Sequence, residues 1–222
     1  VPVIAGTGSN ETENAIELSQ YASSVGVDGL LVVTPYYNKA TQKGLVLMFN
    51  AIADSVNTPI ILYNVPSRTG IGIEPQTYVE LAKHPNIVGI KEANGNISKI
   101  VQTARLVGDR LDIWSGNDDQ IVPVLSMGGS GVISVLSNIM PRETSEMCKR
   151  FWRGDLQGAA NDQCRYLDLI NSLFCEVNPI PAKAAVAAMG FGANRLRLPL
   201  TPMEKDHEAV LLKNMRDLGL IK

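Results

Sequence analysis

Lys91 is the residue of this chain whose type and position offer the most distinctive chemistry. It ends the apolar run Ile87–Lys91, with the sequence IVGIK. A lysine at the C-terminal end of a buried parallel strand is partly withdrawn from water, which disfavours its ammonium form and leaves a free amine that can attack a carbonyl carbon. The alternative is a lysine whose stem extends to the rim and whose ammonium pairs with Glu92. Position alone leaves both interpretations open.

Tyr63 ends a similar apolar run, Pro59–Tyr63, one strand–helix unit before Lys91. Neighbouring parallel strands place their carboxyl ends side by side, so the sequence predicts that Tyr63 and Lys91 face each other. A phenol beside an amine can pass protons during carbinolamine and imine steps. The alternative is a tyrosine that only packs against a loop.

Three further side chains follow strand-like runs. Arg68 lies in the predicted loop Asn64–Gly70, where its guanidinium would suit a substrate carboxylate, or would bond only to loop carbonyls. Tyr36 and Tyr37 follow Thr34-Pro35 at the end of another run. An aromatic pair there would anchor an interface or contribute to a site.

Short apolar runs alternate along the chain with amphipathic stretches. The runs are rich in Val, Ile and Leu without polar alternation, which is typical of parallel strands buried on both faces. The predicted strands are Val1–Ala5, Gly29–Val33, Pro59–Tyr63, Ile87–Lys91, Leu111–Trp114 and Gly131–Ser134. The predicted helices between and after them are Glu11–Ser24, Gln42–Asp54, Gln76–Ala82, Ser98–Val107, Asp119–Met127 and Arg142–Trp152.

This repeat predicts an α/β fold, either a barrel or a doubly wound sheet. The chemically active residues cluster at the ends of several strands, and no GxGxxG follows a first strand, so we favour a (β/α)8 TIM barrel. Only six of its eight units are visible, and Val1 already lies in a strand-like run, so we expect the first two units to be missing. The predicted domains are a partial barrel, 1–154, and a C-terminal helical extension, 155–222, with helices at Asp155–Cys175, Pro181–Met189 and Glu204–Leu218.

Composition narrows the function classes. The chain has 222 residues, 20 basic and 22 acidic side chains, and no basic tract, so nucleic acid is not an expected partner. No run is long enough to cross a membrane, and we expect no signal peptide. The three cysteines form no CxxC pair and are expected to be reduced and mostly buried, which indicates a cytoplasmic location. The two histidines lack ligand-spaced partners, so we expect neither a metal site nor a Ser-His-Asp triad.

Together these segments resemble the pyruvate-dependent class I aldolases, and among them the dihydrodipicolinate synthase family. The matching stretches run in order from Val3 to Pro202. They are VIAGTGSN, VTPYYNK, LYNVPSRTG, GIKEANGN, WSGNDD, GGSGVISV, VNPIPAK and LRLPLTP. The pair YN-P and GIKE is typical of the whole group, whereas SRTG after YNVP is typical of this family.

The resemblance implies a lyase of lysine (diaminopimelate) biosynthesis that condenses pyruvate with L-aspartate 4-semialdehyde and needs no metal or organic cofactor. It implies that Lys91 forms the Schiff base, that Tyr63 exchanges protons, and that Tyr37 belongs to a proton relay reaching a neighbouring subunit. It implies that Arg68 holds the semialdehyde carboxylate, and that the backbone at Ile133 and Gly116 borders pyruvate. The family is commonly a homotetramer of tight dimers.

Two features limit the resemblance. The family relay also uses a threonine pair in a GTTGE-type loop, which this sequence lacks, so a non-catalytic fragment remains an alternative. Another aldolase, such as an N-acetylneuraminate lyase, is a second alternative.

Lysine-sensitive relatives bind the inhibitor through positions that correspond to Asn10 and Tyr36, and through a glutamate where this chain has Asn14. We therefore expect weak feedback inhibition by lysine, or none.

Overall fold

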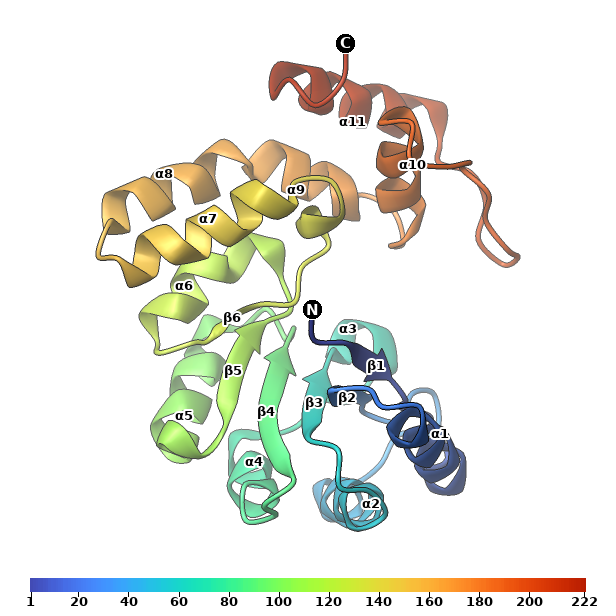
Figure 1. The fold of residues 1–222 in the computed structure, drawn as a ribbon, viewed down its shortest axis with the longest axis vertical. Helices are drawn as coiled ribbons and strands as arrows, with labels where there is room; N and C mark the ends of the chain where they lie inside the picture. Colours follow the sequence, from blue (N-terminus) through green and yellow to red (C-terminus); the bar gives the residue numbers. More distant parts are fainter. The chain divides into compact units, whose positions relative to one another are not determined.

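The computed structural model, which describes residues 1–222, contains a six-stranded parallel sheet (Figure 1). The strands are β1 (Ile4–Gly6), β2 (Gly29–Val33), β3 (Ile60–Asn64), β4 (Ile87–Glu92), β5 (Asp112–Ser115) and β6 (Gly131–Val132). All neighbouring strands pair in parallel, in the order β1-β2-β3-β4-β5-β6. A doubly wound sheet reverses its strand order at a switch point. This sheet does not, so the α/β prediction is confirmed and the doubly wound alternative is wrong.

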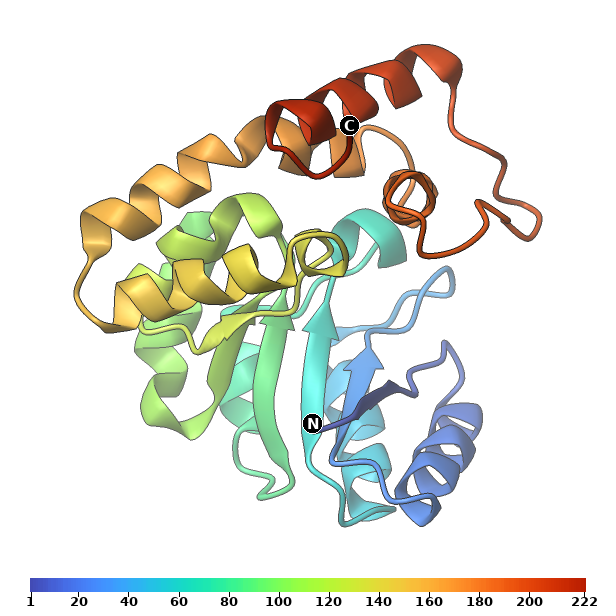
Figure 2. The same cartoon turned by 45° about the horizontal axis from the view of Figure 1, so that its top comes forward.

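The helices that follow the strands cover one side of this sheet, as Figure 2 shows. They are α1 (Thr12–Ser24), α2 (Gln42–Asp54), α4 (Pro75–Leu81) and α5 (Ile97–Val107). The core between sheet and helices includes Leu30, Leu62, Ile90, Phe49 and Ile100, all fully or almost fully buried. On the opposite face of β3, Ile61 is also buried, whereas Leu31 and Val33 of β2 are apolar but half-buried, so both faces of these strands are apolar and their sequences show no polar alternation.

Strand ends differ by up to three residues from the prediction. β1 begins at Ile4 rather than Val1, and β6 has only two residues, Gly131 and Val132, rather than four. The ladder nevertheless continues past β6, because the Ile133 N–H donates to the Ser115 carbonyl at 2.9 Å.

The chain divides into two compact units. One contains Val1–Asn117 and Pro123–Ile133, with the whole sheet; the other contains Asp118–Val122 and Ser134–Lys222. The remaining helical elements are α3 (Pro66–Thr69), η1 (Gly108–Arg110), η2 (Asp118–Gln120), α6 (Ile121–Ser126), η3 (Leu136–Asn138), α7 (Pro141–Trp152), α8 (Leu156–Arg165), α9 (Leu167–Phe174), α10 (Ile180–Ala188) and α11 (Lys205–Asp217).

Two predictions for the second unit need correction. The single helix Asp155–Cys175 is wrong: α8 ends and α9 begins around Tyr166, whose φ of −92° and ψ of −1° depart from helical geometry. The thiols are free, but only Cys148 is buried; Cys164 and Cys175 are exposed. No helix in the structure is both long enough and apolar enough to traverse a bilayer.

Candidate active site

Lys91 and Tyr63 lie opposite each other at the carboxyl ends of β4 and β3. The two residues are register partners, and the Lys91 Nζ atom lies 4.2 Å from the centroid of the Tyr63 ring. Parallel strands put equivalent side chains on the same face, so the amine and the phenol meet at the same edge of the sheet. Both side chains are half-buried.

Trp114 and two glycines shape the surroundings of Lys91, and sequence reasoning had assigned no role to Trp114 or Gly89. Trp114 is the register partner of Lys91 on β5. Its ring lies over Gly89, where an added Cβ would come within 2.4 Å of the indole. A Cβ at Gly116 would lie 3.3 Å from Lys91 Cε and 2.7 Å from Ala93 Cβ. Lys91 therefore lies beside the Tyr63 ring, and the strand end leaves no room for a side chain at Gly116.

Arg68 belongs to the short helix α3 rather than to a loop, which corrects the prediction for residues 64–70. Pro66 occupies the first turn of α3, and Gly70 ends it with a φ of 74°. Both are ordinary signals of helix ends. Burial raises the pKa of the Tyr63 phenol, while the positive charge of Arg68 lowers it. The charge of Arg68 therefore acts on the same end of the sheet as the Tyr63 phenol.

Two buried threonines hold α3 against the end of β2. The Thr34 hydroxyl donates to Thr69 Oγ1 at 3.1 Å, and the Thr69 hydroxyl donates to the Ile71 carbonyl at 2.8 Å. Both side chains are buried. This contact ties the helix that carries Arg68 to the sheet that carries Tyr63.

Glu92 is a buried acid directly after Lys91. Its side chain is 1% exposed, and burial raises the pKa of its carboxyl group to about 7, although hydrogen bonds from Asn64, Tyr78 and the backbone of Asn94 and Ala93 lower it. Successive residues of a strand point to opposite faces, so Glu92 faces α4 while Lys91 faces away from it. The alternative interpretation, in which the Lys91 ammonium pairs with Glu92, did not take this alternation into account.

The raised pKa predicts a pH dependence of stability. The Glu92 carboxyl group has a pKa of 4.5 in the unfolded chain and about 7 in the fold, so it holds its proton more tightly when the chain is folded. Protonation of Glu92 therefore adds most to the free energy of unfolding below pH 4.5. This contribution, about 3 kcal/mol in total, is lost as the pH rises through 7. Urea titrations at pH 5 and pH 8 should show the free energy of unfolding falling more steeply in the unmodified chain than in Glu92→Gln. Parallel pH profiles for the two proteins would contradict this.

The other predicted residues lie outside the pair of Lys91 and Tyr63. The Tyr37 side chain is 92% exposed, and its φ of 72° lies in the left-handed region. Tyr36 is 43% exposed. Asn38 Nδ2 donates to the Asn10 carbonyl at 2.8 Å, which joins the loops of Asn10 and Tyr36, and Asn14 Nδ2 donates to Ser9 Oγ at 3.0 Å.

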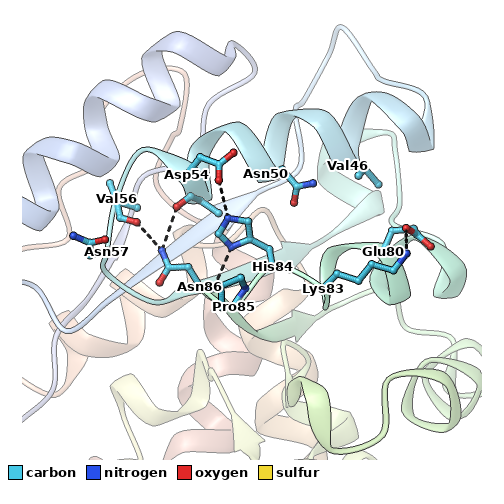
Figure 3. A pocket seen from close by; sticks show the side chains of 11 residues that line it. Val46, Asn50, Asp54, Val56, Asn57, Glu80, Lys83, His84, Pro85 and Asn86 are labelled. Atoms are coloured by element: carbon cyan, nitrogen blue, oxygen red, sulfur yellow. Dashed lines mark hydrogen bonds and ion pairs between the residues drawn. The ribbon is translucent and has the colours of Figure 1, made fainter.

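A cavity of about 750 Å³ lies at the opposite end of the same strands (Figure 3). Residues just before β3 and β4 line it, among them His84, whose Nε2 atom lies 3.1 Å from Asp54 Oδ1. Its Nδ1 atom accepts the Asn86 N–H at 3.1 Å, so both ring nitrogens are engaged. The structure contains no cluster of three or more His, Cys, Asp or Glu side chains that could hold a metal ion. Of the two regions, only the carboxyl edge of the sheet combines an amine, a phenol and a guanidinium.

Comparison with known proteins shows the family of this chain. The model of the Dihydrodipicolinate synthetase family matches residues 1–217. The 4-hydroxy-tetrahydrodipicolinate synthase of Clostridium perfringens (strain ATCC 13124) is 54% identical over 222 residues, which cover 100% of this chain and 76% of the relative.

Solved structures show the same relationship. The chloride-inhibited dihydrodipicolinate synthase from Acinetobacter baumannii, complexed with pyruvate, has a TM-score of 0.97 and 43% identity, covering 100% of this chain and 76% of that one. A monomeric dihydrodipicolinate synthase variant has a TM-score of 0.98 and 42% identity, covering 100% and 75%. With most of its length matched by sequence and by structure, this chain belongs to the dihydrodipicolinate synthetase family.

Proposed function

We propose that this site condenses pyruvate with L-aspartate 4-semialdehyde to give 4-hydroxy-tetrahydrodipicolinate, with Lys91 as the Schiff-base residue. The observation that carries the proposal is the Lys91 amine held against the Tyr63 ring at the ends of two adjacent parallel strands. Membership of the family makes the activity a lyase reaction of lysine biosynthesis. The relative from A. baumannii is complexed with pyruvate, which supports pyruvate as the first substrate.

The chemistry begins with attack of the neutral Lys91 amine on the keto carbon of pyruvate. Tyr63 donates a proton to the oxygen that departs as water, and an imine forms. The protonated imine withdraws electrons, so the pyruvate methyl group loses a proton and becomes an enamine. The enamine carbon attacks the aldehyde carbon, whose oxygen takes up a proton. The amino group of the semialdehyde portion then displaces Lys91 from the imine carbon, which closes the ring and restores the free lysine.

The remaining site residues have supporting roles in this proposal. Arg68 holds the carboxylate of the incoming semialdehyde, and the backbone at Gly116 and Ile133 borders pyruvate beside Lys91. Tyr37 extends the proton relay, and its exposed side chain is suited to reach another subunit. Asn10, Asn14 and Tyr36 form a weak lysine-binding site, since Asn14 offers an amide where a carboxylate would pair with the inhibitor's ammonium.

Arg68→Ala is expected to lower kcat/KM for the semialdehyde by roughly 30- to 150-fold, because a charge-assisted bidentate contact is lost. Imine formation with pyruvate should be almost unchanged, since pyruvate binds before the semialdehyde. The measurements are steady-state kinetics with each substrate varied and borohydride trapping of the pyruvate adduct. Arg105→Ala, on the exposed face of α5, is the matched control.

Two outcomes would overturn this assignment. Equal kcat/KM for the semialdehyde in Arg68→Ala and Arg105→Ala would remove Arg68 from the site. Turnover of N-acetylneuraminate by the unmodified protein at a higher kcat/KM than the semialdehyde condensation would favour the N-acetylneuraminate lyase alternative instead.

The proposal extends to the scaffold. We infer that the six strands in sequence order are consecutive strands of a (β/α)8 barrel, with residues 155–222 as a helical extension. The comparison of sequences supports this, because the chain matches 76% of the length of its relative. A homotetramer and a cytoplasmic location belong to the same proposal. One related synthase variant is monomeric, so assembly is a property to be measured for this chain.

A further inference from the structure

A buried polar cluster lies directly behind the active pair. Glu92 accepts hydrogen bonds from Asn64 Nδ2, at 2.9 and 3.1 Å to its two oxygens, and from the Tyr78 hydroxyl at 2.9 Å. The Asn94 N–H also donates to it, at 3.0 Å. The side chains of Asn64, Glu92 and Tyr78 are at most 1% exposed. We call these three residues the strand-end cluster.

The cluster is the immediate sequence neighbour of the active residues on both strands. Asn64 follows Tyr63 on β3, Glu92 follows Lys91 on β4, and the register pairs Tyr63 with Lys91 and Asn64 with Glu92. Since strand side chains alternate, the reactive pair occupies one face and the cluster the other. A shift of either strand end would therefore move an active residue and a cluster residue together.

Asn64 also fixes the segment that carries Arg68. Its Oδ1 atom accepts the Ile73 N–H at 3.1 Å. The chain thus leaves Asn64, forms α3 with Arg68, and returns to Asn64 at Ile73. One amide side chain connects both strand ends to the segment that bears the third site residue.

Holding β3 and β4 together does not by itself require a buried carboxyl group. A buried acid is costly to desolvate, and a well-packed apolar pair would hold two strands as well or better. Hydrogen bonds, unlike apolar contacts, are directional and fix position. Every side-chain or backbone partner given above for Glu92 donates a hydrogen bond, so the carboxylate acts as a shared acceptor for β3, α4 and the chain after β4.

We propose that the strand-end cluster positions the Tyr63 phenol against the Lys91 amine, with Glu92 as the shared acceptor. The cluster residues are positioning residues that act through Tyr63 and Lys91 without touching substrate. This inference rests on the proposed function, because it assigns the cluster a role in the imine chemistry of Lys91.

The test reverses the direction of the Asn64–Glu92 hydrogen bonds. Glu92→Gln can set an amide N–H against the Asn64 amide, and Asn64→Asp sets two carboxylates together. Each single variant should lose at least 30-fold in kcat and in the rate of borohydride-trapped imine formation, since small displacements of reacting groups cost about 100-fold. The double variant Asn64→Asp/Glu92→Gln again pairs a carboxylate with an amide. It should recover at least 10-fold in kcat over Glu92→Gln.

The matched control is Asn86, which directly precedes β4 at the opposite end of the same two strands. Asn86 Nδ2 donates to the Val56 and Thr58 carbonyls, at 2.9 and 3.1 Å, just before β3. Asn86→Ala should lower the melting temperature yet keep kcat within about twofold of the unmodified protein, well below its melting temperature. A purely structural role for the cluster would instead make kcat follow thermal stability in all variants.

Three outcomes would overturn the inference. These are a folded Glu92→Gln with kcat within threefold of the unmodified protein, a double variant no more active than Glu92→Gln, and equal kcat losses in Glu92→Gln and Asn86→Ala. If the Glu92 variants do not fold, Tyr78→Phe decides, with an expected kcat loss of about fivefold and an unchanged kcat as the contrary result. The proposed function fails separately, when the unmodified protein traps no pyruvate on Lys91.

Discussion

Lys91→Arg is expected to form no borohydride-stable adduct with pyruvate and to lose at least about 1,000-fold in kcat. Arginine stays protonated at all working pH values, so it has no lone pair with which to attack the keto carbon. Lys91 is only half-buried, and arginine keeps its positive charge and long stem, so the fold should be retained. Mass spectrometry of the reduced protein and steady-state kinetics are the two measurements.

Lys99→Arg is the control for this substitution. Lys99 lies on α5 and pairs with Glu74 at 3.0 Å, an exposed contact that arginine can keep. It should retain the adduct and normal turnover. A pyruvate adduct that persists in Lys91→Arg, or one that maps to a different lysine in the unmodified protein, would remove Lys91 from its role.

The sequence predicted the sheet well because its strands carry apolar residues on both faces. Runs such as Gly29–Val33 have no polar positions, and β2 has the predicted bounds. The pairing of Tyr63 with Lys91 followed from the same regularity, since one strand–helix unit separates them and the register keeps equivalent positions together. Helix α2 also has the predicted bounds, Gln42–Asp54.

What the sequence did not reveal depends on contacts between distant residues. The strand-end cluster needs Tyr78, from a helix, to meet Glu92, and no local pattern marks that contact. The break at Tyr166 also lacks a local signal, because neither proline nor glycine adjoins it in the sequence. Helix α3 was missed differently: Pro66 and Gly70 marked its ends, but its four residues are too few for periodicity.

Tyr63→Phe tests the phenol separately from the ring. Phenylalanine keeps the aromatic face beneath Lys91 Nζ, so the contact at 4.2 Å should survive and the hydroxyl alone is lost. Because burial raises the pKa of Tyr63, its hydroxyl holds a proton near neutral pH and begins the reaction as a donor. General acid–base groups contribute about 100- to 10,000-fold. We therefore expect kcat to fall about 100- to 1,000-fold in this variant.

The pattern of the loss matters as much as its size. KM for pyruvate should change little, because the hydroxyl acts on proton transfer rather than on binding, and the adduct on Lys91 should still form, only more slowly. Tyr21→Phe, which removes an exposed phenol from α1, is the matched control and should behave like the unmodified protein. A Tyr63→Phe variant with normal kcat would show that Tyr63 serves Lys91 only as a packing surface. Complete absence of the adduct would instead mean that the hydroxyl is required for the first attack on pyruvate.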